Sequence, residues 1–284
     1  MDGKLDQKIG TTPLRLDNYD ADGKRLVRQQ ETNSGDFAAD ALYYLFDSMG
    51  MDVDLAVMNG GGVRNAALTG EISYKTCKEI HTFGNVACLQ TVTGQQILDM
   101  LEWGARAVGK ADEGGFLQVS GLKYHINTAL ASTVKEDENG AWSGPPQSYR
   151  VSRVEIFDKE TLSYRPLELD ALYNVAGYNF TLRDQGDGFT MLKDAKNVLD
   201  YVMEDYMVLA NYVSAFDEGT VKADNSPLLK KYPSFLLDYS SVNGCGRITV
   251  TNELPSAPVT ADGGSPLCLL LSLALALSLI KRKG

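Results

Sequence analysis

Residues that build metal sites and disulfide frameworks are scarce in this sequence. Its four cysteines form no C-x-x-C pair, and its two histidines, His81 and His125, are too far apart for an H-x-x-x-H motif. A zinc site or a disulfide-stapled fold is therefore not expected. We expect both histidines to be structural, and we expect this chain to bind no metal ion and no other cofactor.

A basic surface is also lacking. The 27 lysine and arginine residues face 37 aspartate and glutamate residues, which gives a net charge of −10, and three of the cations are Lys281, Arg282 and Lys283. Because proteins that bind nucleic acid need a positive face, the composition argues against that function. An anionic ligand must be small and must be met by local cations.

Neither end of the sequence has a long apolar segment. The first residues contain no basic stretch followed by an apolar one, so we expect no signal peptide. The apolar run at residues 267–280 is 14 residues long, whereas a membrane span needs about 20. It follows a stretch rich in Pro, Gly and Ser and precedes the basic end, an order that resembles the sorting tails of Gram-positive surface proteins.

This pattern predicts three regions: a folded domain at residues 1–253, a linker at 254–266, and an apolar anchor or sorting tail at 267–284. We expect an extracellular protein held at the cell wall or membrane of a Gram-positive bacterium. Residues 258–262 resemble a sortase motif, although Ala257 stands where a leucine is expected. Covalent wall attachment, simple membrane retention and a lipid anchor all stay open.

Hydrophobic residues make up 44% of the 284 positions, enough for a sizeable core. Helical spacing runs through residues 37–49, with Gly50 at the position of a C-terminal cap. A second helix is predicted to begin at a capping box formed by Thr93 and Gln96, and its apolar face extends to Val108. A third helix is predicted at residues 201–216.

Strands are predicted at residues 53–58, 85–91, 116–126, 150–157 and 173–180. In the fourth, Val151, Arg153 and Glu155 alternate with Ser152, Val154 and Ile156. Residues 128–148, rich in Ser, Gly, Pro and charge, are predicted to be an exposed excursion. Because helices and strands do not alternate strictly, we expect an α+β fold with a mixed sheet flanked by helices, and not a doubly wound nucleotide fold.

The stretch VMNGGGVR at residues 57–64 joins an apolar strand to three glycines and then to Arg64. Glycine lets a backbone approach a ligand closely, and arginine offers a planar fork to a phosphate or carboxylate. The stretch predicts an anion-binding turn. It matches neither G-x-G-x-x-G nor G-x-x-x-x-G-K-[ST], so a tight turn without a ligand is the other interpretation.

The order of several motifs is more specific than any one of them. RQQETNSGDF (28–37) precedes the first helix, NGGGVR (59–64) follows the first strand, and FGN (83–85) opens the next. They are followed by TG (93–94), LE (101–102), GFLQVSG (115–121), NF (179–180) and GDGF (186–189). From about Leu5 to Val250 the chain resembles the C-terminal domain of the 5'-nucleotidase family, which includes UDP-sugar hydrolases and cyclic-nucleotide phosphodiesterases.

The resemblance implies that seven residues bind a nucleotide. Taken singly, each is more often a structural or surface residue, so the roles rest on their joint order. By resemblance, Arg28 and Arg64 hold the phosphate, Asn59 and Asn85 line the site, Phe83 and Phe180 sandwich the base, and Asp187 accepts the ribose hydroxyls. The chemistry suits these roles, because guanidiniums grip phosphate, aromatic faces stack on any base, and a carboxylate accepts two hydroxyl protons.

Three positions depart from the usual pattern of the family. Thr82 replaces a proline before the first aromatic residue, Gln185 replaces the first glycine of Gly-Gly-Asp-Gly, and one extra residue separates Phe180 from Asp187. All three differences concern the loops around the predicted base stack.

In this family a separate N-terminal metallophosphoesterase domain holds two divalent metal ions and a catalytic His–Asp pair. No motif in the present sequence resembles that domain, so we expect no catalytic residues in it. The resemblance implies the nucleotide-recognition domain of a 5'-nucleotidase-like hydrolase in nucleotide catabolism, with the catalytic domain in cis or in a separate chain. The expected ligand is a nucleoside or nucleotide, in first place a 5'-monophosphate. A stand-alone, surface-anchored nucleotide-binding module is the alternative.

Overall fold

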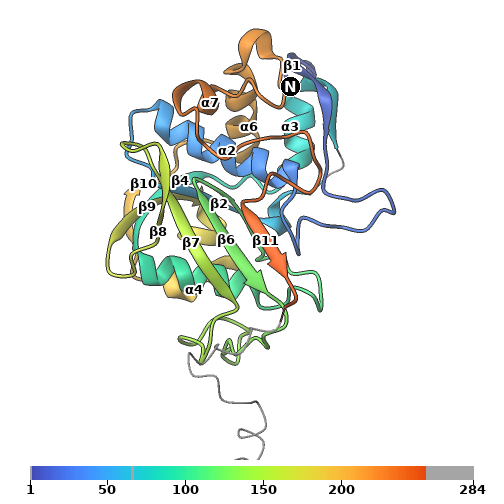
Figure 1. Cartoon of the computed structure of the whole chain (residues 1–284). Coiled ribbons are helices and arrows are strands. Elements are labelled where there is room, and N and C mark those ends of the chain that lie inside the picture. The colour runs from blue at the N-terminus through green and yellow to red at the C-terminus, as the bar shows by residue number, and fades with distance from the viewer. Residues whose placement is uncertain (1, 65–66, 254–284) are drawn as a thin grey trace, which may run out of the picture. The chain divides into compact units, whose positions relative to one another are not determined.

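A five-stranded mixed sheet lies at the centre of the protein (Figure 1). The computed structural model describes residues 2–64 and 67–253. Within the sheet, β2 and β9 are parallel and all other neighbours are antiparallel. In spatial order the strands are β10 (Lys196–Leu199), β4 (Ala87–Thr93), β9 (Leu172–Tyr178), β2 (Leu55–Asn59) and β5 (Leu117–Ser120).

Two smaller sheets accompany the central one. A four-stranded sheet has the order β11 (Ile248–Thr251), β6 (Leu122–Asn127), β7 (Val151–Asp158) and β8 (Ser163–Pro166). Its strand β11 comes from the end of the described chain and runs parallel to β6. A two-stranded antiparallel sheet pairs β1 (Lys8–Leu16) with β3 (Leu68–Ser73).

Helices cover both faces of the central sheet. The α-helices of the described residues are α1 (Asp2–Leu5), α2 (Asn33–Ser48), α3 (Tyr74–Ile80), α4 (Gly94–Ala105), α5 (Asn179–Leu182), α6 (Asp205–Ser214) and α7 (Pro227–Lys231). Helix α2 packs on one face together with α3 and α6, whereas α4 and the four-stranded sheet cover the other face (Figure 1).

Strand β2 shows why the central sheet is buried on both sides. Ala56 and Met58 belong to the core under α2, while Leu55 and Val57 belong to the core that contains α4. Since successive side chains of a strand point to opposite faces, a strand covered on both faces is a continuous apolar run. The predicted fold class, α+β with a mixed sheet flanked by helices, is confirmed.

The first two predicted helices are confirmed. Thr32 caps α2 by accepting a hydrogen bond from the Gly35 amide, and Gly50 follows the helix with a φ of +75°. In α4 the predicted capping box is present: the Gln96 amide donates to Thr93 Oγ1 at 3.2 Å, and the Thr93 amide donates to Gln96 Oε1 at 2.9 Å. Each cap satisfies amide groups that the first helical turn leaves without partners.

Three predicted element boundaries are wrong. The strand at residues 116–126 is broken at Gly121, whose φ is +70°, and there the chain passes from the central sheet into the four-stranded sheet. A Cβ at Gly121 would lie 2.6 Å from the carbonyl oxygen of Asp54, so only glycine fits. Strand β9 ends at Tyr178, which places Phe180 in α5, and the helix predicted at residues 201–216 begins at Asp205.

The predicted alternation in β7 is also wrong. Arg153 has a φ of +50° and is exposed, and Val151 is buried along with Val154 and Ile156. The register against β6 shifts at the same point. A β-bulge therefore inserts one residue and returns the apolar side chains to the core face, which strict alternation cannot predict.

The excursion predicted at residues 128–148 contains no helix or strand, apart from an isolated bridge between Glu136 and Trp142. Within residues 2–64 and 67–253, no helix has the length and apolar character required to cross a membrane. The predicted linker at 254–266 and the predicted anchor at 267–284 lie outside the described residues.

Candidate functional site

A hollow of about 530 Å³ opens at one edge of the central sheet. This volume lies within the range of ligand pockets in proteins. All seven residues predicted for the site line it, together with three glycines: Arg28, Asn59, Gly61, Gly62, Arg64, Phe83, Asn85, Gly114, Phe180 and Asp187. We call this hollow the pocket.

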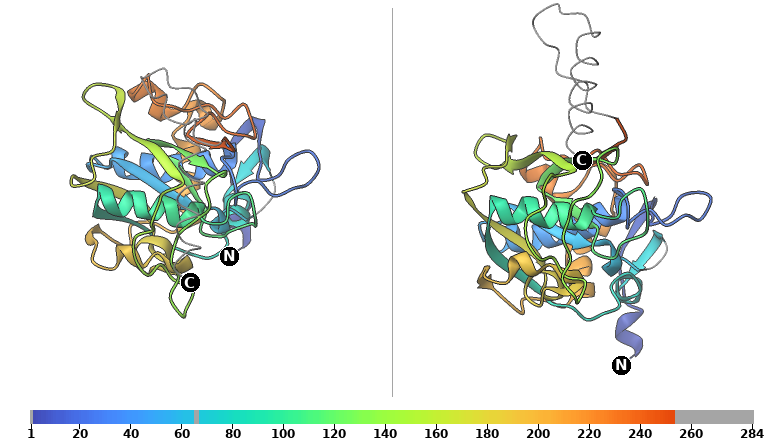
Figure 2. Two further views of the ribbon diagram at one scale, coloured as in Figure 1. Left: turned by 60° about the horizontal axis from the view of Figure 1, so that its bottom comes forward. Right: turned by 90° about the horizontal axis from the view of Figure 1, so that it is seen from below.

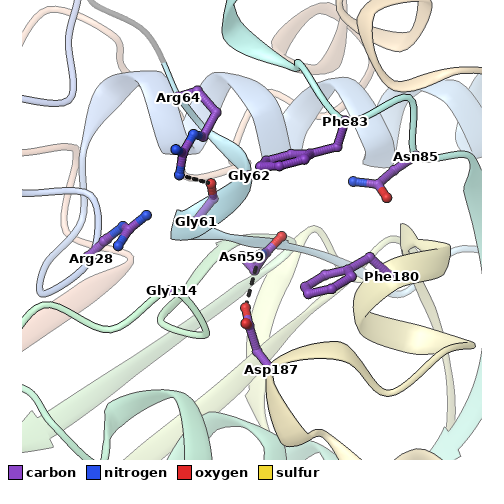
Figure 3. Close-up of a pocket in the computed structure, with 10 residues that line it drawn as sticks. All are labelled: Arg28, Asn59, Gly61, Gly62, Arg64, Phe83, Asn85, Gly114, Phe180 and Asp187. Atoms are coloured by element: carbon purple, nitrogen blue, oxygen red, sulfur yellow. Dashed lines mark hydrogen bonds between the residues drawn. The ribbon is translucent and has the colours of Figure 1, made fainter.

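The parallel pairing of β2 and β9 brings distant parts of the chain to the pocket. Both strands end at the same edge of the sheet, because parallel strands share their direction. Asn59 is the last residue of β2 and residues 60–64 follow it, and the segment from Phe180 to Asp187 follows β9. Figure 3 shows Arg28 at one end of the pocket, Phe180 and Asn85 at the other, and Asn59 and Asp187 between them. The guanidinium of Arg64 lies 5.5 Å from the centre of the Phe83 ring, so these two residues are neighbours.

The glycine turn after β2 packs closely against neighbouring backbone and also lines the pocket. The amide of Gly60 donates to Phe116 O at 2.7 Å, and the amide of Gly61 donates to Gly114 O at 2.8 Å. A Cβ at Gly60 would lie 2.2 Å from the carbonyl oxygen of Val27, so this glycine admits the segment that carries Arg28. Gly61 and Gly62 line the pocket itself, where no side chain of theirs covers the backbone.

The guanidinium groups of Arg25, Arg28 and Arg64 lie near one another at the pocket. The Nε atoms of Arg25 and Arg28 are buried and have no hydrogen-bond partner among the described residues. Burial lowers the pKa of Arg25, and the positive charges of Arg28 and Arg64 lower the pKa further. Like charges held together with unused donors favour a bound anion. Sequence reasoning missed Arg25, although its spacing of three residues from Arg28 was a signal.

The fully buried Gln118 positions the segment that carries Arg28. Its Nε2 atom donates to the carbonyl oxygens of Val27 at 3.0 Å and Gln30 at 2.7 Å, and its Oε1 atom accepts from the Thr32 amide at 3.1 Å. A buried amide with all these partners fixes a loop firmly. Sequence reasoning missed this role, and the only signal was a polar residue inside an apolar strand.

Two aromatic rings line the pocket, Phe83 from the loop before β4 and Phe180 from the short helix α5. Figure 3 shows Phe83 and Phe180 on opposite walls, with the side chain of Asn85 beside them. Phe83 is 59% exposed, so its ring offers a face that no other side chain covers fully. A Cβ at Gly186 would lie 2.4 Å from the ring of Phe180, which explains the glycine at this position.

Asp187 faces the middle of the pocket from a left-handed turn. Its carboxylate accepts a hydrogen bond from Asn59 Nδ2 at 3.2 Å, and its φ is +54°. Burial raises the pKa of Asp187, while the hydrogen bond from Asn59 opposes that change. Gln185, which replaces a glycine of the family pattern, is also left-handed, with a φ of +56°. Despite the extra residue in this loop, Phe180 and Asp187 line the same pocket.

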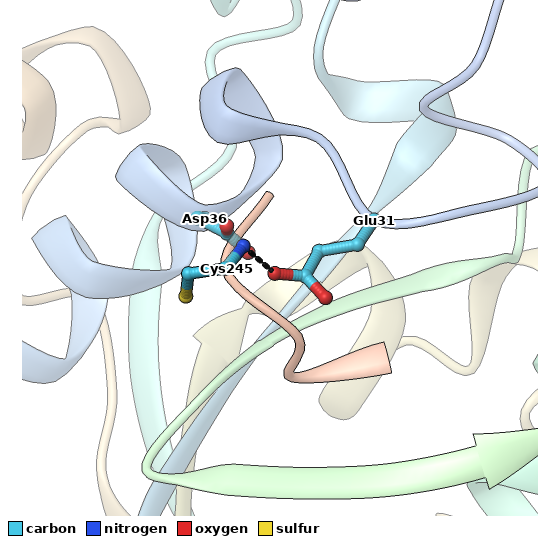
Figure 4. A group of neighbouring side chains, drawn as sticks. All are labelled: Glu31, Asp36 and Cys245. Atoms are coloured by element: carbon cyan, nitrogen blue, oxygen red, sulfur yellow. Dashed lines mark hydrogen bonds between the residues drawn. The ribbon is translucent and has the colours of Figure 1, made fainter. Parts of the chain in front are cut away.

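One group in the described part of the chain could offer three ligand atoms to a metal ion. The donor atoms of Glu31, Asp36 and Cys245 lie within 4.8 Å of one another (Figure 4), and none of the three residues lines the pocket. The carboxylate of Glu31 already accepts three backbone N–H groups from residues 245–248. Burial raises the pKa of the Cys245 thiol to about 12, which disfavours the thiolate that a metal requires.

The same cluster can also hold a proton in place of a metal ion. Both carboxyl oxygens of Asp36 are buried without a hydrogen-bond partner among the described residues, and the guanidinium of Arg247 is 3.8 Å away. That guanidinium binds Asp40 at 2.8 Å. Burial raises the pKa of Asp36 well above its usual value, so a protonated Asp36 can donate to Glu31.

Comparison with known proteins finds relatives of the chain. The family model described as "5'-nucleotidase, C-terminal domain" matches residues 8–194. Trifunctional nucleotide phosphoesterase protein YfkN of Bacillus subtilis is 29% identical over 239 residues, which cover 82% of this chain and 15% of the relative. Cell wall protein Lmo0130 of Listeria monocytogenes is 28% identical over 220 residues, which cover 75% of this chain and 25% of the relative.

Solved structures agree with these matches. The 5'-nucleotidase precursor from Thermus thermophilus is similar, with a TM-score of 0.66 and 29% sequence identity over 89% of this chain and 41% of that chain. The chain thus spans a minor part of the length of these relatives. Because the family model covers more than half of the sequence, the chain belongs to the family of the 5'-nucleotidase C-terminal domain.

Proposed function

We propose that the pocket binds a nucleotide and that the chain is the recognition domain of a 5'-nucleotidase-like hydrolase in nucleotide catabolism. The observation that supports this most is the order of groups along the pocket, which runs from the Arg28 guanidinium through the Asp187 carboxylate to the Phe180 ring. A nucleotide has the same order of phosphate, ribose and base. Membership of the family supports the proposal independently.

Each part of the ligand has a partner in this arrangement. Arg28 and Arg64 bind the phosphate with charge-assisted hydrogen bonds. The base stacks between Phe83 and Phe180, and Asn85 lies beside the stack. The carboxylate of Asp187 accepts the ribose hydroxyls. A nucleoside 5'-monophosphate satisfies all three partners.

Phe180→Ala is expected to weaken the binding of adenosine to the full chain about tenfold. The ring supplies one of two stacking faces, and stacking contributes about 1–3 kcal/mol per base. Titration calorimetry of the parent and the variant measures the change. Tyr201→Ala is a suitable control, because Tyr201 is an aromatic residue that is 70% exposed and does not line the pocket. Equal affinities of the parent and Phe180→Ala would contradict the proposed stack.

Hydrolysis is proposed to depend on an N-terminal metallophosphoesterase domain with two divalent metal ions, in the same polypeptide or in a second one. The greater length of the relatives supports this division. The 284-residue chain, supplied with Mn²⁺, Zn²⁺ or Co²⁺, should therefore release no phosphate from AMP above the blank. Metal-dependent turnover by the pure chain would contradict the proposal. The alternative, a stand-alone nucleotide-binding module, predicts no metallophosphoesterase reading frame beside the gene.

We also propose that the protein acts at the surface of a Gram-positive cell, held at the wall or membrane by residues 267–284. The name of the relative from Listeria monocytogenes, a cell wall protein, supports this location. Fractionation of cells that express an exported form tests it. Deletion of residues 267–284 should release the protein to the medium, and equal release of the undeleted form would contradict the proposal.

A further inference from the structure

We propose that Trp103 is a positioning residue for Asp187 and that it thereby sets a preference for ligands with a ribose cis-diol. This inference rests on the proposed function, because it takes Asp187 as the partner of the ribose. Trp103 does not line the pocket. It acts through the main chain of the turn that carries Asp187.

The turn at residues 185–188 is strained. Gln185 has a φ of +56°, Asp187 a φ of +54° and Gly188 a φ of +82°. A left-handed conformation costs a residue with a side chain about 1–2 kcal/mol. Two such residues in four persist only when surrounding contacts hold them, and strained residues of this kind gather at binding sites.

Trp103 supplies the central contact from the side of α4. Its indole Nε1 donates to the carbonyl oxygen of Asp187 at 2.8 Å, and its ring is fully buried. A Cβ at Gly188 would lie 2.8 Å from Cζ2 of the same ring, so the turn is in close contact with the indole. Because the bond holds the carbonyl of Asp187 itself, it fixes the backbone from which the carboxylate projects.

Arg106 holds the indole in place and links it to neighbouring segments. Its guanidinium stacks 3.9 Å from the centre of the Trp103 ring. It also pairs with Glu113 at 3.2 Å and with Glu136 at 3.4 Å. Glu113 precedes Gly114, which lines the pocket, and Glu136 belongs to the excursion at residues 128–148. Trp103 therefore contacts the turn directly, and through Arg106 it is linked to the segments that carry Glu113 and Glu136.

The excursion holds the same turn from a second side. The amide of Trp142 donates to Gly188 O at 3.0 Å, and the hydroxyl of Thr190 donates to Trp142 O. In Figure 2 the green loops of the excursion lie against the yellow segment that follows β9. The turn is thus held by an indole N–H on one side and by the main-chain bond from Trp142 on the other, and of these two bonds only the first depends on side-chain identity.

The consequence concerns one part of the ligand. Two vicinal hydroxyls donate to one carboxylate only if the carboxylate has a defined direction. Loss of the indole N–H should therefore weaken the binding of a ribonucleoside more than that of a nucleoside without these hydroxyls. Adenosine and its dideoxy analogue carry the same base, and neither carries a phosphate. A comparison of the two therefore isolates the contact of the hydroxyls with Asp187 from the stacking on Phe180.

Calorimetry with the full chain tests this preference. For each variant the affinity ratio of adenosine to 2',3'-dideoxyadenosine is measured. Trp103→Phe keeps an aromatic ring beneath Arg106 but removes the donor, and it should reduce the ratio about fivefold, which is the effect of one hydrogen bond. Trp142→Phe is the matched control, because the bond from Trp142 to the turn comes from its backbone, and the ratio should stay as in the parent.

An unchanged affinity ratio in Trp103→Phe, including the case in which both ligands lose the same affinity, would overturn this inference alone. A parent that does not prefer adenosine would overturn the proposed role of Asp187, and the inference with it.

If Trp103→Phe does not fold, the parent is studied by NMR. The sequence has two tryptophans, so Trp142→Phe assigns the indole N–H signals. The Trp103 signal should shift with adenosine and hardly with the dideoxy ligand, and equal shifts would refute the inference.

Discussion

Replacing Arg28 and Arg64 together by glutamine should weaken the binding of AMP a hundredfold or more, at about 1.5–3 kcal/mol for each charged hydrogen bond. Adenosine should bind almost as tightly as it does to the parent, because it lacks the phosphate. The expected result is that the double variant no longer distinguishes AMP from adenosine. Calorimetry with both ligands on the full chain measures this difference.

The control for this experiment removes the same charge elsewhere. Arg153→Gln/Arg165→Gln changes two exposed arginines that do not line the pocket. This control should keep the difference between AMP and adenosine at physiological ionic strength, where distant charges are screened. If both double variants lose the same affinity for AMP, Arg28 and Arg64 act through the overall electrostatic field of the protein and not through a phosphate site.

Asp36→Asn should become more stable, relative to the parent, as the pH rises. Burial raises the pKa of Asp36 well above its usual value. The folded parent therefore keeps a proton that the unfolded chain releases above about pH 4. The stability that this proton contributes is complete below the unfolded pKa and is lost as the pH rises towards the folded pKa. An asparagine also donates to Glu31 but does not titrate.

The difference in unfolding free energy between the two proteins should grow by up to about 1.4 kcal/mol per pH unit above pH 4. Urea unfolding from pH 4 to pH 8 measures it, and the exposed Asp170→Asn controls for the change in net charge. A constant difference would show that Asp36 is not protonated in the folded state. If Zn²⁺ stabilises the parent but not Asp36→Asn, the cluster of Glu31, Asp36 and Cys245 holds a metal ion after all.

Much of the fold could be predicted from local patterns. The helix around residues 37–49 and the capping box of Thr93 and Gln96 depend on neighbours in sequence, and both are confirmed. The predictions of a continuous strand through Gly121 and of strict alternation at Arg153 were wrong for the same reason. The break at Gly121 depends on contacts with residues 43 and 54, and the bulge at Arg153 depends on register with β6. Such distant contacts leave no periodic trace in the sequence.

Some residues of the pocket could likewise be predicted from the sequence, and the residues that support them could not. The residues that line it follow a motif order, so Arg28, Phe83 and Asp187 could be named before the structure was seen. Gln118 and Trp103 could not, because their effects pass through the main chain of segments more than 80 residues away. A motif names the groups that face a ligand. It does not name the groups that hold those groups in place.

The position of β9 between β4 and β2 has a consequence for synthesis on the ribosome. Strands β2 and β4 emerge early, but the strand that joins them comes only with residues 172–178. Phe180 and Asp187 emerge later still. A nascent chain that stops before Leu172 therefore lacks the strand between β4 and β2, and it also lacks two residues of the pocket wall, Phe180 and Asp187. Retention on an immobilised nucleotide would then separate completed chains from shorter translation products.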